Sequence, residues 1–208
     1  MILTKLHRMR AAFAATISQT AHRPLGCLIL AALLAISVSL PGLARAQDWA
    51  ALDSPTAIIL MRHALAPGTG DPANFALGDC ATQRNLDARG RVQATRIGED
   101  LRARGIDVAE IWTSQWCRCR ETADLLALAP IRDMPPLNSF FRNRSQGPAQ
   151  SAALLQDLAR WQGGRLILVT HQVNITALTD IFPASGEMIV TEYRDGRLDV
   201  TGRVEIAP

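Results

Sequence analysis

The stretch Ile58-Ile59-Leu60-Met61-Arg62-His63-Ala64 runs from an apolar segment directly into an arginine and a histidine. Pro55 precedes it, and Pro67, Gly68 and Gly70 follow it. A short apolar run bounded in this way predicts a strand covered on both faces. In open α/β sheets the ligand crevice lies outside the carboxyl ends of the strands. Arg62 and His63 therefore indicate an anion site, although a histidine that ends a strand is more often structural.

The same pattern returns at Leu166-Ile167-Leu168-Val169-Thr170-His171, another apolar strand that ends on a histidine. His63 and His171 are the only histidines after residue 46. A βαβ arrangement brings both to one edge of the sheet, and this shared location favours a functional role over a structural one. Arg118, near the start of a predicted helix, reaches the same edge unless it forms only a surface salt bridge. Because guanidinium groups match phosphate oxygens, we expect a phosphoryl-binding pocket.

The rest of the chain predicts an α/β fold. We expect three layers, with a mostly parallel, doubly wound sheet, helices on both faces and an antiparallel C-terminal edge hairpin. The expected elements are a helix capped by Asp87 and ended by Gly105, a strand from Val108 to Thr113, a helix to about Leu128, a surface excursion from Pro130 to Gly147, a helix from Pro148 to Gly163, and a hairpin of Met188 to Tyr193 with Arg197 to Ile206 around Asp195-Gly196.

Residues 1–46 have the composition of an export signal. They hold five cations and no acid, with an apolar run from Leu25 to Leu40 and the small-residue triplet Ala44-Arg45-Ala46. This order predicts cleavage after Ala46, a periplasmic or secreted protein, and no stable membrane insertion after cleavage. An uncleaved membrane anchor is the alternative, for which the apolar run is slightly short.

The remaining residues, 47–208, are enough for one domain with a substantial core. They carry 17 basic and 19 acidic side chains, a net charge of −2. No basic stretch with interleaved aromatic residues remains, so we expect no nucleic-acid partner.

Three cysteines remain after residue 46, namely Cys80, Cys117 and Cys119. In an oxidising compartment we expect one disulfide between Cys80 and either Cys117 or Cys119, with the third cysteine as a buried thiol. A metal site is the alternative, but a C-x-C pair and one distant cysteine lack a convincing fourth ligand.

Several separated motifs together resemble the histidine phosphatase superfamily, across nearly all of residues 56–180. They are Leu60-Met61-Arg62-His63-Ala64, Arg84-x-Leu86 with Gly90 and Gln93-Ala94, Ser114-x-x-x-Arg118-x-x-x-Thr122-Ala123, and Val169-Thr170-His171. The resemblance implies that His63 is the nucleophile and that Arg62, Arg118 and His171 hold the phosphate oxygens. It also implies a small phosphorylated substrate, hydrolysis of a phosphohistidine by water, and no metal or other cofactor.

Two positions depart from the family pattern. Arg62-His63-Ala64 stands where the family usually has Arg-His-Gly, a modest change. The acid that protonates the leaving oxygen is harder to place, because Gln172 follows His171. Asp71, Asp79 and Glu187 are the candidate donors, with Asp71 and Glu187 retained as possible site residues. Without a donor, good leaving groups such as aryl phosphates or phosphohistidine would be favoured.

The sequence thus predicts a metal-independent phosphomonoester hydrolase that acts through a phosphohistidine on His63. The alternative is a catalytically weak or inactive phosphate- or phosphosugar-binding protein of the cell envelope. Specificity is expected to reside in the loop from Ala66 to Cys80 and in the excursion from Pro130 to Gly147. The paired Phe140-Phe141 either line a substrate entrance or anchor that excursion to the core.

Overall fold

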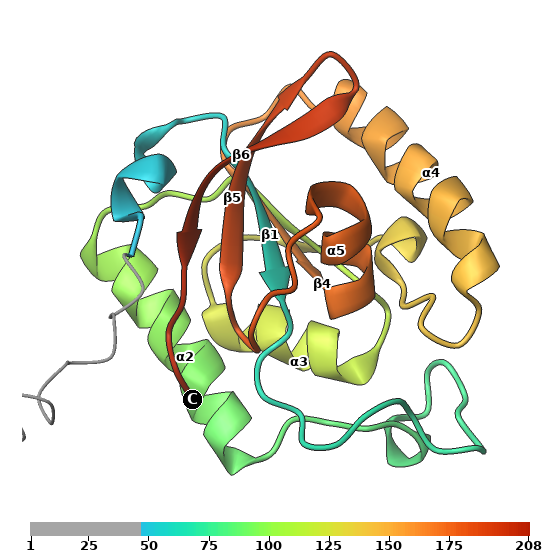
Figure 1. The fold of residues 1–208 in the computed structure, drawn as a ribbon. Coiled ribbons are helices and arrows are strands. Elements are labelled where there is room, and N and C mark those ends of the chain that lie inside the picture. Colours follow the sequence, from blue (N-terminus) through green and yellow to red (C-terminus); the bar gives the residue numbers. More distant parts are fainter. Residues whose placement is uncertain (1–46) are drawn as a thin grey trace, which may run out of the picture. The chain divides into compact units, whose positions relative to one another are not determined.

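A six-stranded mixed sheet organises the chain in the computed structural model, which describes residues 47–208 (Figure 1). The predicted export signal, residues 1–46, lies outside the described residues. The strand order is β3-β2-β4-β1-β5-β6. The strands are β1 (Ile58–Arg62), β2 (Glu110–Thr113), β3 (Ile131–Asp133), β4 (Leu166–Thr170), β5 (Met188–Arg194) and β6 (Arg197–Val204).

The two strands that precede the histidines are neighbours. β1 and β4 pair in parallel, and Arg62 is aligned with Thr170. The backbone N–H of His63 continues this ladder by donating to the carbonyl of Thr170 at 2.9 Å. Because parallel strands end at the same edge, His63 and His171 emerge side by side.

Alternate residues of β1 and β4 pack into two cores on opposite faces of the sheet. Ile59 and Ile167 lie on the face of the sheet that α2 (Ala88–Ala103) and α3 (Cys117–Leu126) cover. Leu60 and Leu168 lie on the opposite face, which α4 (Gly147–Ala159) and α5 (Gln172–Thr179) cover. Burial on both faces explains why these strands read as continuous apolar runs. The two helix layers, visible in Figure 1, confirm the predicted three-layer α/β fold.

Local signals in the sequence account for the element boundaries. Asp87 caps α2, with its Oδ1 accepting from the N–H of Gly90 at 2.7 Å. Asp195 and Gly196 both have positive φ, the geometry of a tight hairpin turn, and join the antiparallel strands β5 and β6 at the sheet edge.

The excursion from Pro130 to Gly147 is more regular than predicted. Its first residues form the short parallel edge strand β3, which pairs with β2. A strand of three residues is too short to show a strand period, which is why the pattern missed it. The turns η3 (Pro135–Leu137) and η4 (Arg144–Gln146) complete the segment, and η2 (Cys80–Thr82) and η1 (Trp49–Asp53) lie elsewhere in the described chain.

A disulfide joins Cys80 to Cys117, the first residue of α3, and Cys119 is a buried free thiol. This resolves the choice left open by the sequence, since Cys119 faces the core instead of the loop. No helix among residues 47–208 is both long and apolar enough to cross a membrane.

Candidate active site

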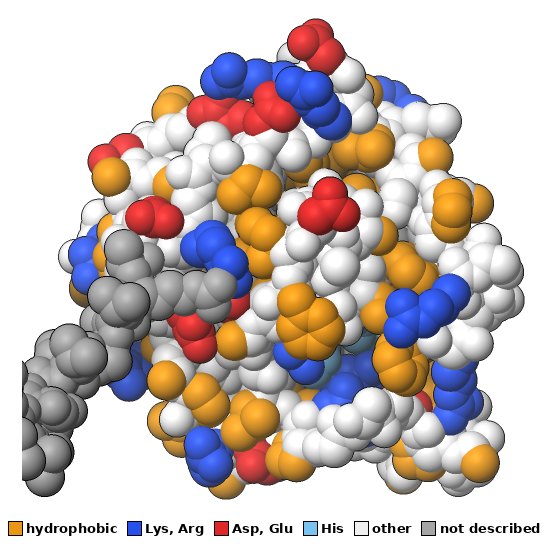
Figure 2. Space-filling view, in the orientation of Figure 1, with side chains coloured by type: hydrophobic (Ala, Val, Ile, Leu, Met, Phe, Trp, Pro, Cys, Tyr) orange, Lys and Arg blue, Asp and Glu red, His pale blue; other side chains and the backbone are white. Residues whose placement is uncertain are grey.

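A cavity of about 480 Å³ opens at the carboxyl ends of β1 and β4. Both histidines line it, and their ring centroids are 5.5 Å apart. The space-filling view shows histidine atoms recessed between basic and hydrophobic side chains (Figure 2). Five arginines and one carboxylate, that of Asp71, are the charged groups that line the cavity. The site is therefore strongly electropositive and suited to an anion.

The backbone fixes the tautomer of the buried His63 ring. Its Nδ1 lies 2.8 Å from the carbonyl oxygen of Ala64. Because a carbonyl oxygen only accepts hydrogen bonds, Nδ1 carries the proton and Nε2 carries the lone pair. The Nε–H of Arg118 donates to this Nε2 at 3.2 Å, which agrees with the assignment. His63 thus presents an unprotonated nitrogen to the cavity.

Arg118 connects the groups of the site. Besides His63, its guanidinium donates to both carboxylate oxygens of Asp71, at 2.7 and 3.2 Å, to the Arg84 carbonyl at 3.2 Å, and to Nδ1 of His171 at 3.3 Å. An arginine has five N–H donors, so every donor of Arg118 is occupied within the protein. A phosphate that binds Arg118 must therefore displace one of these partners.

His171 lies in the opposite tautomer to His63. Its Nδ1 accepts from Arg118, so its Nε2 bears the proton and lies 2.9 Å from Oγ of Ser114. The hydroxyl of Ser114 donates in turn to Oδ1 of Asn138 at 3.2 Å. This chain of hydrogen bonds holds the imidazole rigidly at the base of the cavity.

Arg62 and Arg84 have donor capacity left for a ligand. The Nε of Arg62 is buried without a hydrogen-bond partner in the described chain, while its NH1 donates to the carbonyl of Pro183 at 2.9 Å. A buried unpaired donor costs about 1–3 kcal/mol. Arg84 holds the loop carbonyls of Gly70 and Ala66 through its Nε and NH1.

Burial and mutual repulsion lower the pKa values of the basic groups. Desolvation and then the charge of Arg118 hold the pKa of His63 well below 6.5, and the same two causes act on the pKa of His171. Desolvation and Arg118 also lower the pKa of Arg84 to about 10. At neutral pH both imidazoles are uncharged, while the arginines remain cationic.

Comparison with known proteins agrees with this geometry. Residues 58–151 match the model of the histidine phosphatase superfamily (branch 1). This match to the superfamily model covers the part of the chain that carries Arg62, His63 and Arg118. This match, together with the paired histidines and arginines, makes the protein a phosphatase. No curated protein matches the sequence.

Solved structures of histidine phosphatase type share the fold at low identity. The protein assigned as phosphohistidine phosphatase SixA from Agrobacterium tumefaciens is 19% identical with a TM-score of 0.52, and the match covers 73% of this chain and 98% of that one. The Escherichia coli protein assigned as alpha-ribazole-5'-P phosphatase is 15% identical with a TM-score of 0.54, and the match covers 74% of this chain and 98% of that one. The phosphoserine phosphatase of Entamoeba histolytica, solved with 3-phosphoglyceric acid, is 15% identical with a TM-score of 0.52. The match covers 73% of this chain and 98% of that one.

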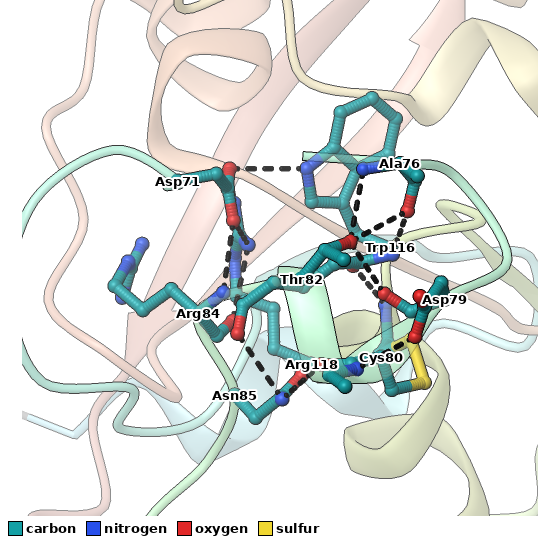
Figure 3. Close-up of a disulfide and its surroundings, with 12 residues drawn as sticks. Asp71, Ala76, Asp79, Cys80, Thr82, Arg84, Asn85, Trp116 and Arg118 are labelled. Carbon is teal, nitrogen blue, oxygen red and sulfur yellow. Dashed lines mark hydrogen bonds and ion pairs between the residues drawn. A yellow bond between two sulfur atoms is a disulfide. The ribbon is translucent and has the colours of Figure 1, made fainter. Parts of the chain in front are cut away.

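The candidate acids of this phosphatase occupy different places. Asp71 lines the cavity and also accepts from the indole N–H of Trp116 at 3.2 Å (Figure 3). Glu187 is fully buried, accepts from the N–H of Ala184 and pairs with Arg203 at 2.6 Å, and does not line the cavity. Asp79 caps η2 at the exposed end of the loop. The structure therefore corrects the expectation for Glu187 and leaves Asp71 as the acid at the site.

Several cavity residues were not singled out from the sequence as site residues. Arg84 was noted only within a family motif, and its position at the end of a glycine-rich loop was the available signal. Arg142 and Arg144 stand at the mouth of the cavity, together with the exposed Phe182. The pair Phe140-Phe141 divides its roles, because Phe140 is buried against Gly147 whereas Phe141 lines the cavity.

The phosphatase site is built from cations, not from metal ligands. Within residues 47–208, no three His, Cys, Asp or Glu side chains are grouped so that they could hold a metal ion. Cys119 lies 3.5 Å from Nε2 of His171, and burial raises the pKa of its thiol to about 12. The thiol is therefore protonated and is not a nucleophile at neutral pH.

Proposed function

We propose that this phosphatase is a metal-independent phosphomonoester hydrolase that forms a phosphohistidine on His63. The observation that carries the proposal is the unprotonated Nε2 of His63, selected by the Ala64 carbonyl in a cavity lined by five arginines. Its lone pair accepts from Nε–H of Arg118 in the free protein, so the phosphoryl group must displace that hydrogen bond. In many phosphoryl-transfer enzymes Mg²⁺ neutralises the charge of the transferring group. Here the guanidinium groups are suited to that task.

The reaction has two steps. The Nε2 lone pair forms a bond to phosphorus while the bond from phosphorus to the ester oxygen breaks, and the leaving oxygen takes a proton from an acid. Water then attacks the phosphohistidine, the phosphorus–nitrogen bond breaks, and a proton from the water returns to the acid. The guanidinium of Arg62, which lines the cavity, is suited to hold a phosphate oxygen throughout.

We assign the acid role to Asp71. In the free protein its carboxylate is paired with Arg118, and its pKa is lowered, because the hydrogen bonds and charge of Arg118 outweigh the opposing effect of desolvation. A substrate phosphate competes with Asp71 for the same guanidinium donors. Once displaced beside a dianion, the carboxyl has a raised pKa and can carry the proton that the leaving oxygen requires.

Hydrolysis of p-nitrophenyl phosphate by the wild type and by His63→Ala tests the proposal. The wild type should release p-nitrophenol in the presence of EDTA, whereas His63→Ala should be inactive with an unchanged unfolding temperature. Arg160→Gln, at an exposed position outside the cavity, serves as the control and should retain full activity. Activity that survives in His63→Ala would contradict the mechanism, and phosphate binding without turnover in the wild type would favour a phosphate-binding protein.

We further propose that the phosphatase is exported to the periplasm or secreted. The composition of residues 1–46 supports this, as does the Cys80–Cys117 disulfide, because such bonds persist in oxidising compartments. Cell fractionation with N-terminal sequencing tests the proposal. A mature chain that begins at Gln47 in the exported fraction is expected, and an intact leader in the cytosol would contradict it.

A further inference from the structure

A second hollow adjoins the catalytic cavity. This open groove of about 520 Å³ lies between η3 and α4 and shares Trp116, Ser139 and Gln146 with the cavity. We call it the neutral groove. Since three residues line both hollows, the groove lies directly beside the cavity that holds His63.

The neutral groove differs from the cavity in its chemistry. No charged side chain lines it, whereas five arginines line the cavity. Its polar groups are the amides of Asn138, Gln146 and Gln150 and the hydroxyl of Ser139. Amides and hydroxyls both donate and accept hydrogen bonds, so they suit an uncharged group that carries many hydroxyls. A second phosphate or carboxylate would find no cation there.

Several of these groups are held in place from behind. Oδ1 of Asn138 accepts from Ser114 Oγ and from the N–H of Gln115, and its amide nitrogen donates to Oε1 of Gln115 at 2.9 Å. The side-chain amide of Gln150 donates to the Asn138 carbonyl at 3.0 Å. These bonds occupy Oδ1 of Asn138 and the side-chain N–H groups of Gln150, which leaves Oε1 of Gln150, the amide of Gln146 and the hydroxyl of Ser139 for a ligand. A subsite with fixed polar groups costs little entropy when it binds its ligand.

Trp116 forms the wall between the two hollows. Phe75 stacks on its ring at a centroid distance of 4.9 Å, and His171 lies against it edge-on at 5.5 Å. Its N–H donates to Asp71, so the ring is fixed on several sides. An aromatic ring beside amide groups offers an apolar surface to C–H groups while the amides bind hydroxyls. Ala149 and Ala153, one turn apart on α4, keep the opposite wall low.

We propose that the neutral groove is a substrate subsite for an uncharged glycosyl unit. The substrate class is a phosphorylated saccharide, with its phosphate at His63 and a neighbouring neutral sugar in the groove. This inference rests on the proposed phosphatase function and adds a preference for the group that follows the phosphorylated unit.

Matched substrates test the subsite. The wild type should hydrolyse maltose 6'-phosphate with a kcat/KM about tenfold or more above that for glucose 6-phosphate, the range expected for one well-filled subsite. Ala153→Leu, which fills the groove, should abolish this preference and leave p-nitrophenyl phosphate hydrolysis unchanged. Ala152→Leu is the matched control, since Ala152 is exposed on the same helix and lines neither hollow. It should behave as the wild type.

Equal kcat/KM for the two sugar phosphates would overturn the inference, as would an equal loss on all three substrates in Ala153→Leu. A preference for glucose 1,6-bisphosphate over maltose 6'-phosphate would also overturn it, because the arginines of the cavity would then select the substrate. If the wild type hydrolyses nothing, the proposed function fails separately. In that case, calorimetry measures the affinities for maltose 6'-phosphate and glucose 6-phosphate. Equal affinities would reject the proposed subsite.

Discussion

A single backbone carbonyl selects the reactive nitrogen of His63. The Ala64 oxygen holds the proton on Nδ1, and the buried cationic surroundings lower the pKa of the ring. The result is a neutral imidazole whose unprotonated Nε2 accepts from Arg118 in the free protein. The methyl group of Ala64, the position where the family pattern has glycine, is fully buried against Ala66, Leu86 and Ala94.

Nitrogen-15 NMR of the histidine rings tests this state. At pH 6.5 an unperturbed histidine is half protonated, but both His63 and His171 should remain neutral, with His63 in the Nδ1–H form. The lowered pKa values also make the free energy of unfolding fall as the pH drops below about 6.5, because the unfolded chain then binds protons that the folded chain excludes. A titration midpoint near 6.5 for the His63 ring would contradict the structure.

Asp71 gives a prediction about leaving groups. Asp71→Asn should slow the hydrolysis of an alkyl phosphate by about 10²–10⁴-fold, the range for loss of a general acid. Hydrolysis of p-nitrophenyl phosphate, whose leaving group needs little protonation, should change far less. Asp79→Asn, in the same loop but outside the cavity, is the control. An equal loss on both substrates would show that Asp71 only positions Arg118.

At the scale of elements, the loop after β1 completes the site. It carries Asp71 and ends near Arg84, and the Cys80–Cys117 bond ties it to the first residue of α3, next to Arg118 (Figure 3). The disulfide thereby fixes the loop to the helix that carries Arg118. The sequence predicted that this loop borders the site, but no local pattern specifies which loop side chains turn inward.

Removal of the disulfide should weaken both stability and activity. The residues in this bond are 37 positions apart, so the chain-entropy model predicts a loss of about 4 kcal/mol in the free energy of unfolding for Cys80→Ser with Cys117→Ser. Displacement of Arg84 and Asp71 should lower kcat/KM on the order of tenfold or more. Dithiothreitol should reproduce both effects in the wild type and leave the double variant unchanged. An unaltered kcat/KM in the double variant would contradict the claim that the disulfide holds the loop and α3 in the active arrangement.

For the whole molecule, charge is distributed unevenly. Residues 47–208 carry a net charge of −2, yet five arginines and one aspartate line the cavity. Such a contrast concentrates field lines at the site and attracts anionic substrates. Composition alone could not predict this, because Arg84 and the pair Arg142 and Arg144 come from two separate segments that only the fold brings together.

The ionic strength dependence of kcat/KM tests this focusing. For p-nitrophenyl phosphate, kcat/KM should fall between low salt and 0.5 M NaCl, since salt screens charges over about 10 Å at 0.1 M. Arg142→Gln with Arg144→Gln should flatten the dependence, whereas Arg160→Gln, outside the cavity, should not. Identical salt profiles for the wild type and the double variant would contradict a steering role for the rim.

The sequence predicts the elements of this fold that have a clear hydrophobic pattern, but not the positions of individual loop side chains. The continuous apolar runs of β1 and β4 predicted the buried parallel strands, and the shared edge of such strands predicted that His63 and His171 meet. The short strand β3 and the inward-facing Arg84 were missed, because three residues show no period and a loop arginine shows its partners only after folding. Glu187 illustrates the opposite error, since sequence position could not show that Arg203 already pairs with it.

The covalent intermediate is the most direct test of the account. The wild type should be mixed rapidly with p-nitrophenyl phosphate, denatured at alkaline pH to preserve phosphohistidine, digested and sequenced by mass spectrometry. We expect a phosphoryl group on His63, formed within one turnover and lost as substrate is exhausted. Turnover with no modification of His63, or with the phosphoryl group on another residue, would contradict it.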